Sequence, residues 1–181
     1  MASKVKQTRN MSIPNTPQNP SGYGDPAFEF AVYIGNTPSV YEHSGYSDLQ
    51  PMKPGDIASI VQQTGNHWRK IFNLYAKLMH QLEPGLESEW QQYREGRLLQ
   101  RGSKQALLFS QPQLGKPSTA IHLVTGKSHA EHLGLLTRCD AINEHFYVNC
   151  TAKLIVSPYF DYRQLSNRKL ETLVEIVRSI R

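Results

Sequence analysis

The stretch Phe28–Tyr41, FEFAVYIGNTPSVY, decides the fold class. Over residues 28–34 large apolar side chains alternate with other residues at a period of two, which predicts a β-strand. Glu29 is its only charged residue, so we expect both faces of the strand to be covered, as in a sheet with helices on each side. Gly35 ends the strand, and residues 36–39 are turn-forming or capping types.

The rest of the chain alternates between strand and helix patterns. Strands are expected at 106–109, 119–125 and 152–157, with a weaker one at 142–148. Helices are expected at 57–63, 67–82, 86–99, 128–136 and from 168 onward, and 39–55 is expected to be a long loop. This alternation predicts an α/β fold, a three-layer α/β/α sandwich with a mostly parallel central sheet.

Composition predicts one domain, 28–181, preceded by a Pro- and Asn-rich N-terminal tail, 1–27. Lys plus Arg number 20 against 15 Asp plus Glu, a formal charge of +5 that is compatible with a polyanionic partner. Cys139 and Cys150 match no disulfide framework, and we expect a reduced, cytoplasmic setting. No apolar run is long enough to span a membrane.

Three polar loops are expected at one edge of the sheet, because ligands of open α/β sheets bind outside the carboxyl ends of the strands. They follow the strands that end near residues 34, 125 and 157. The candidate ligand contacts are Gly35, Thr37, Pro38, Tyr41, Lys127, Ser128, Ser157, Tyr159 and Arg163, and the candidate catalytic residues are Asn36 and Asp161. Ser128 with Glu131 reads as a capping box, so a helix is expected to begin there. The His and Cys spacings match no zinc pattern, and we expect neither a metal nor a cofactor.

These motifs resemble those of the uracil-DNA glycosylase superfamily. The segment 31-AVYIGNTP-38 is similar to its first motif, a strand followed by a G-x-x-P loop. The segment 123-LVTGKSHA-130 is similar to its middle turn, and 154-LIVSPYFDYR-163 to its closing loop, with the proline and arginine in step. The resemblance implies a three-layer fold and hydrolysis of the N-glycosidic bond of a flipped base. Tyr41 or Tyr159 would stack on the base, Asn36 would contact the base or a water, and Arg163 would approach phosphate or fill the stack.

The chain departs from that pattern at the catalytic positions. The closing histidine of the family falls on Ser157, and Asn36 and Thr37 stand where many members carry a carboxylate. Asp161 is the only carboxylate in the three motif loops. Two alternatives to the hydrolase therefore stay open. One is a non-catalytic module that binds a nucleotide or DNA, and the other is a protein-interaction domain. We expect a cytosolic protein of bacterial type, and the sequence leaves its oligomeric state open.

Overall fold

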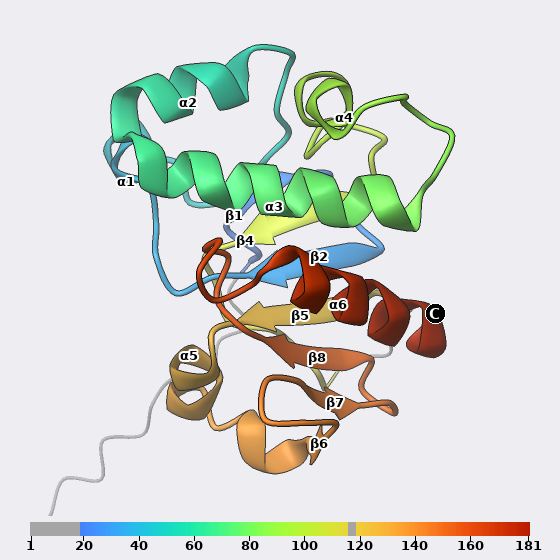
Figure 1. Ribbon diagram of the computed structural model, residues 1–181. Helices are drawn as coiled ribbons and strands as arrows, with labels where there is room; N and C mark the ends of the chain where they lie inside the picture. Colours follow the sequence, from blue (N-terminus) through green and yellow to red (C-terminus); the bar gives the residue numbers. More distant parts are fainter. Residues whose placement is uncertain (1–18, 116–118) are drawn as a thin grey trace, which may run out of the picture.

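The computed structural model describes residues 19–115 and 119–181, which form a mixed α/β fold around an eight-stranded sheet (Figure 1). The strand order is β3-β1-β4-β2-β5-β8-β7-β6. The strands are β1 Gly22–Gly24, β2 Phe30–Tyr33, β3 Leu49–Gln50, β4 Gln105–Leu108, β5 Ile121–Thr125, β6 Asp140–Ala141, β7 Tyr147–Asn149 and β8 Leu154–Ser157. The helices are α1 Ser39–Ser44, α2 Asp56–Thr64, α3 Asn66–Leu82, α4 Trp90–Gly96, α5 Lys127–His132, the 3₁₀ turn η1 Leu136–Arg138, and α6 Asn167–Ile180.

The centre of the sheet is parallel, as the sequence predicts. Neighbouring strands β4, β2, β5 and β8 all run the same way, and Val32 is in register with Leu107 on one side and Leu123 on the other. All four residues of β2 are buried. Because successive side chains of a strand face alternate sides of the sheet, both faces of β2 are covered. Val32 and Leu107 belong to one hydrophobic core, whereas Tyr33 belongs to the core on the opposite face.

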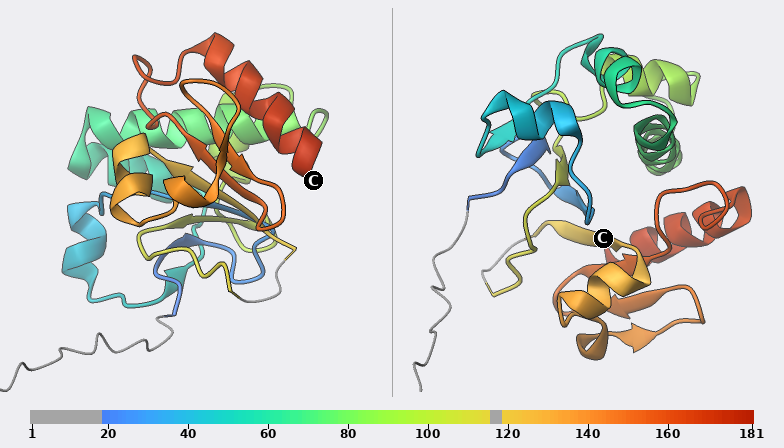
Figure 2. Two further views of the ribbon diagram at one scale, coloured as in Figure 1. Left: turned by 90° about the horizontal axis from the view of Figure 1, so that it is seen from below. Right: turned by 90° about the vertical axis from the view of Figure 1, so that its left-hand side faces the viewer.

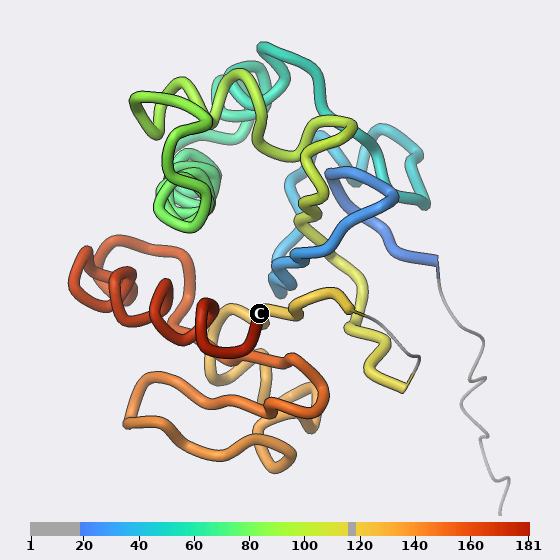
Figure 3. The backbone as a smooth tube through the Cα atoms, turned by 90° about the vertical axis from the view of Figure 1, so that its right-hand side faces the viewer, coloured from blue at the N-terminus to red at the C-terminus, as the bar shows by residue number. Residues whose placement is uncertain are grey.

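The two faces of the sheet are covered unequally (Figures 1 and 2). Helices α2, α3, α4 and α6 supply apolar side chains to the larger core, and α3 packs beside α6 on one side of the sheet (Figure 3). The opposite face is covered by α5, η1 and loop residues, which contribute Ala130, Leu135 and Leu114. None of the helices in the described part of the chain is both long and apolar enough to cross a membrane.

Part of the expected N-terminal tail belongs to the sheet. Residues 1–18 of the expected tail lie outside the described residues, but Gly22–Gly24 form β1, which pairs with β3 and β4. A Cβ at Gly22 would lie 2.1 Å from the carbonyl oxygen of Leu107, so only glycine lets this strand approach β4 so closely. Tyr23 is buried against Tyr41 and Phe109. Composition could not predict this strand, because Gly-Tyr-Gly carries no alternating apolar pattern.

Other element boundaries also differ from the sequence prediction. The expected loop 39–55 contains α1 and β3. Of the expected strand 142–148 only the last two residues are strand, in β7, which pairs antiparallel with β6 just before this range. The residues between β6 and β7 form a turn instead, in which the Asn143 side chain accepts hydrogen bonds from the backbone N–H groups of His145 and Phe146. Of the expected helix 86–99, only the residues of α4, Trp90–Gly96, are helical.

The helix expected at 128–136 is shorter, and it begins differently. Gly126 is the N-cap of α5, and Ser128 is its second residue, so the capping box does not form. Gly134 adopts a φ of 66°, a left-handed conformation that interrupts the helix before η1.

Candidate functional site

The carboxyl ends of β2, β5 and β8 lie together at one edge of the sheet. The backbone N–H of Gly126 donates to the carbonyl oxygen of Ser157 over 2.8 Å, which ties the end of β5 to the end of β8. The Thr125 hydroxyl donates to the carbonyl oxygen of Tyr33 over 3.1 Å, which ties β5 to β2. We call the three segments beyond these strands, residues 35–38, 126–129 and 158–163, the rim loops.

Two glycines allow the rim loops to approach one another. A Cβ at Gly35 would lie 3.0 Å from Nδ1 of His129, so the imidazole packs directly on the backbone that follows β2. A Cβ at Gly126 would lie 3.6 Å from the ring of Tyr159, and Gly126 has a φ of 91°. The rim loops therefore pack on one another through His129 and Tyr159.

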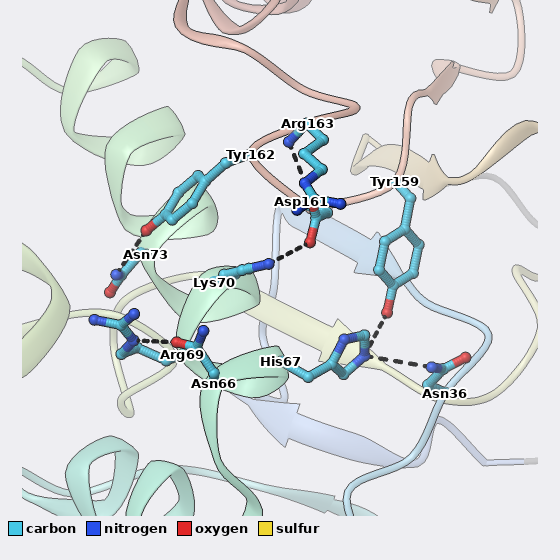
Figure 4. A network of polar contacts seen from close by, with 10 residues as sticks. All are labelled: Asn36, Asn66, His67, Arg69, Lys70, Asn73, Tyr159, Asp161, Tyr162 and Arg163. Atoms are coloured by element: carbon cyan, nitrogen blue, oxygen red, sulfur yellow. Dashed lines mark hydrogen bonds and ion pairs between the residues drawn. The ribbon is translucent and has the colours of Figure 1, made fainter.

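His67, at the start of α3, is the residue at which two of the rim loops, 35–38 and 158–163, meet (Figure 4). Its Nε2 lies 3.0 Å from the Tyr159 hydroxyl and 3.4 Å from Nδ2 of Asn36. The rings of His67 and Tyr159 stack with centroids 5.8 Å apart and planes 18° apart. Burial, followed by the charge of Asp161, raises the pKa of Tyr159 to about 12, so its hydroxyl stays protonated near neutral pH.

The carboxylate of Asp161 is already engaged within the fold. It accepts a hydrogen bond from Nζ of Lys70 over 2.8 Å and from the backbone N–H of Arg163 over 2.9 Å. The hydrogen bond from Lys70, together with that backbone bond, lowers the pKa of Asp161. A carboxylate held in this way is a weak proton acceptor, so its geometry fits turn formation better than general-base chemistry. The side chain of Arg163 is exposed beside it.

Four of the sequence candidates make neither a hydrogen bond nor a ring contact with His67. Tyr41 is buried, and its hydroxyl donates to the carbonyl oxygen of Asp48 and accepts from the backbone N–H of Gly22. Ser157 is buried, and its hydroxyl donates to the carbonyl oxygen of Pro158. The ammonium of Lys127 lies over the ring of Tyr147, 5.2 Å from its centroid. Ser128 is exposed on α5 and makes no capping hydrogen bond.

Two further candidates shape the first rim loop. Pro38 is buried and is the N-cap residue of α1, and Thr37 before it is half-buried. Gly35 and Asn36 are exposed, so they are the part of this loop that a ligand can reach. Of the sequence candidates, the structure thus brings Asn36 and Tyr159 to one point and leaves Gly35 and Arg163 accessible near it.

Sequence reasoning did not identify His67 and His129 as site residues. His129 is half-buried, and burial, followed by the charge of His132, lowers its pKa. The available signal for His67 was its place at the start of a long amphipathic helix, on the polar side. That signal could not show that the start of α3 meets the rim loops, because the contact with Tyr159 joins residues 92 positions apart.

Within residues 19–115 and 119–181, no cluster of three or more His, Cys, Asp or Glu side chains could hold a metal ion. Neither a search of curated proteins nor a search of solved structures found a match. A scan of protein families matched residues 21–178, which include β1 and all three rim loops. By this match, the chain belongs to the Family of unknown function (DUF6942).

Proposed function

We propose that the rim loops bind a nucleobase-containing ligand, either a nucleotide or DNA. One observation carries this proposal: Asn36 and Tyr159, from loops that follow two different strands, both contact Nε2 of His67. An amide and an aromatic ring at the carboxyl edge of a parallel sheet are the groups that read and stack on a base.

The proposed contacts follow from the chemistry of each side chain. The amide of Asn36 has two donors and an acceptor and is exposed, so it can pair with the edge of a base. The half-buried ring of Tyr159 is fixed by His67 and supplies a surface for stacking. Arg163 is exposed in the same rim loop and supplies a positive charge for phosphate.

Hydrolysis of an N-glycosidic bond is the second candidate function, and the position of His67 favours it. The resemblance places the closing histidine on Ser157, which is buried and bonded to the backbone. His67 offers an imidazole at the rim loops instead, where it could stabilise the departing base. In this reaction water adds to the sugar carbon, and the base leaves with the electron pair of the broken bond and takes up a proton.

The layered fold around the site and its cellular setting are also part of the proposal. A three-layer α/β/α sandwich is supported by α5 and η1, which pack on the face opposite α3 and α6. A cytoplasmic setting is supported by the two cysteines, Cys139 and Cys150, which are both free thiols.

Fluorescence polarisation tests the binding proposal directly. Labelled single-stranded and uracil-containing duplex DNA would be titrated at about 50 and about 200 mM salt, with mononucleotides as unlabelled competitors. We expect salt-sensitive binding that falls about tenfold in Asn36→Ala, the loss of roughly 1.4 kcal/mol. Thr151→Ala is the matched control, because Thr151 is an exposed polar residue in the turn between β7 and β8, at the opposite end of β8 from the rim loops.

Each outcome has a defined meaning. Absence of binding at the lower salt concentration for every nucleic acid and nucleotide would overturn the proposal, as would equal affinities for Asn36→Ala and Thr151→Ala. Abasic-site cleavage of the same samples separates the two candidate functions. Abasic product that disappears in His67→Ala supports hydrolysis, and binding without product supports a binding module.

A further inference from the structure

A hollow of about 360 Å³ lies at the edge of the sheet opposite the rim loops. Its wall includes the first residues of three neighbouring parallel strands, Gln105 of β4, Phe30 of β2 and Ile121 of β5. The C-terminal ends of α3 and α6 lie at the same edge (Figures 1 and 3), and Met79 of α3 also lines the hollow. The hollow has the size of a ligand pocket, and it shares no residue with the candidate site.

Gln105 places a buried hydrogen-bond acceptor at this hollow. Its Nε2 donates to the Tyr93 hydroxyl, which in turn donates to the carboxylate of Glu83. Because the phenol gives its single proton to Glu83, it can only accept from Gln105, and this fixes which end of the amide faces Tyr93. Oε1 of Gln105 is buried and has no hydrogen-bond partner among the residues that the structure describes. Buried acceptors are nearly always bonded, so this oxygen indicates a donor that a ligand supplies.

Charged side chains of both signs line the hollow. Lys104 and Glu29 form an exposed ion pair of 2.7 Å with each other, so their charges offset. Lys153 and Arg181 make no ion pair within the described ranges, 19–115 and 119–181. The Glu83 carboxylate has no cationic partner in these ranges, and it lies at the C-terminal end of α3, where the helix dipole also favours a positive group. A ligand suited to this hollow therefore carries one positive and one negative group.

Two of the cationic residues in the wall have an unusual backbone conformation. Lys104 has a φ of 60° and Lys153 a φ of 47°. In the part of the chain that the structure describes, Leu99 is the only other non-glycine residue with a positive φ. Residues other than glycine rarely adopt this conformation, and those that do are concentrated at functional sites. The backbone thus supports a role for the hollow beyond packing.

The two charged ends of the ligand must be well separated. Gln105 begins β4, whereas Lys153 immediately precedes β8, and the strands between them are β2 and β5. Adjacent strands are about 4.8 Å apart, so three spacings place the two backbones about 14 Å apart. The side chain of Lys153 bridges part of this distance. Three extended residues cover about 10 Å, so a tripeptide matches the remaining span, whereas the two ends of a single amino acid are too close together.

We propose that the hollow binds a short peptide of about three residues with both ends free. The N-terminal ammonium donates to Oε1 of Gln105 and pairs with Glu83, the C-terminal carboxylate meets Lys153, and apolar side chains pack on Phe30 and Ile121. A dication would be repelled by Lys153 and a dianion by Glu83, whereas a zwitterion places both charges favourably. The inference is independent of the proposed function, because it concerns the opposite edge of the sheet.

Isothermal titration calorimetry with the peptide Ala-Leu-Ala tests this proposal. At about pH 7 its α-amino group and its α-carboxyl group are both charged. The comparison ligands are the N-acetylated peptide, the C-amidated peptide and free leucine. We expect Ala-Leu-Ala to bind, and each blocked form to bind at least about tenfold more weakly. Leucine should also bind more weakly, because it cannot reach both ends of the hollow.

Two variants assign the ends of the peptide. Gln105→Leu removes the acceptor, so it should weaken Ala-Leu-Ala about tenfold and leave the N-acetylated peptide unchanged, because that peptide has already lost its ammonium. Lys153→Gln should weaken Ala-Leu-Ala about tenfold and leave the C-amidated peptide unchanged. A loss that disappears when the ligand group is blocked is the signature of a direct contact.

Lys169→Gln is the matched control for Lys153→Gln. Both lysines are half-buried, but Lys169 lies in the first turn of α6, at the opposite end of that helix from Arg181. Far-UV circular dichroism and thermal melting verify that each variant is folded. If Gln105→Leu does not fold, Lys153→Gln still tests the hollow through the amidated peptide, because Lys153 lies in the turn before β8.

Several results would overturn the proposal. They are no heat of binding with Ala-Leu-Ala at about 1 mM, equal affinities for the free and blocked peptides, or equal affinities for Lys153→Gln and Lys169→Gln. Leucine that binds as tightly as the tripeptide would overturn the span across the strands. Asn36→Ala should bind the peptide like wild type, so a failure here is distinguished from a failure of the rim loops to bind nucleic acid.

Discussion

The Tyr159 hydroxyl lies 3.0 Å from Nε2 of His67, although the two residues are 92 positions apart in the chain. The contact joins the loop after the last parallel strand, β8, to the start of α3. It fixes the ring of Tyr159 in orientation, because the two rings also stack. A ring held in place loses little side-chain entropy when a base stacks on it, which is the physical advantage of this pair for binding.

Substitutions of Tyr159 separate stacking from hydrogen bonding. Tyr159→Ala removes the ring, and we expect it to weaken binding of single-stranded DNA about tenfold, within the range of base–aromatic stacking. Tyr159→Phe keeps the ring and loses only the hydroxyl contact with His67, so its loss should be smaller. Fluorescence polarisation measures both. Equal losses in the two variants would show that the hydroxyl, rather than the ring, makes the contact that matters.

Gly35→Ala tests how closely the rim loops must pack. The backbone of Gly35 has no positive φ, so alanine fits its conformation, but the new Cβ would lie 3.0 Å from Nδ1 of His129. The half-buried imidazole must then shift, at a cost to the free energy of unfolding of about 1 kcal/mol. We expect weaker ligand binding together with this modest loss, measured by polarisation and urea unfolding.

The control for Gly35→Ala is Gly96→Ala. Gly96 closes α4, and a Cβ there would meet nothing within 4 Å, so alanine should leave stability unchanged or raise it. An unchanged affinity in Gly35→Ala would mean that His129 can move without consequence for the ligand.

Gly22→Ala tests whether β1 belongs to the sheet in solution. Its Cβ would lie 2.1 Å from the carbonyl oxygen of Leu107, a backbone atom that cannot rotate away, and Gly22 has a φ of 149°. We expect a loss of about 3 kcal/mol in the free energy of unfolding. Gly115→Ala, with open space around its Cβ, should change it by less than about 0.5 kcal/mol. Equal stabilities of the two variants would mean that residues 22–24 are not paired with β4.

The sequence predicted the parallel centre of the sheet because its strands carry local patterns. Residues 28–34 alternate at a period of two, and α3 has a continuous apolar stripe, so each pattern is contained in one short segment of the sequence. The strand β1 was missed because its role depends on Leu107, 85 positions away, which no local pattern reports. The helix α1 was missed because a six-residue helix is too short to show a repeat.

The candidate site was predicted in part for the same reason. The rule that polar loops gather beyond parallel strands selected Asn36 and Tyr159, which the structure brings together at His67. It also selected Tyr41 and Ser157, whose hydroxyl groups are bonded to backbone carbonyls instead. Which way a side chain points, and which helix begins beside a loop, depends on packing between distant segments.

The buried pair Tyr33 and His122 predicts how stability depends on pH. Nδ1 of His122 lies 2.8 Å from the Tyr33 hydroxyl, and both side chains are buried on the α5 face of the sheet. Burial lowers the pKa of His122 below its ordinary value of 6.5, so the unfolded chain binds a proton more readily than the folded chain. Stability from this group is therefore fully present above about pH 6.5 and is lost as the pH falls toward the lowered pKa.

Urea unfolding between about pH 7 and about pH 5 measures this effect, with a limiting slope of about 1.4 kcal/mol per pH unit for one proton. His122→Gln can still bond to Tyr33 but does not titrate, so its free energy of unfolding should fall less over this range. Tyr33→Phe is the control, because it removes the hydrogen bond and keeps the imidazole, so it should lower stability and retain the slope. His129, whose pKa burial also lowers, adds a slope of its own that both variants share. The same pH dependence in wild type and His122→Gln would mean that His122 is not the buried group that titrates, and that the acid sensitivity of the fold arises elsewhere.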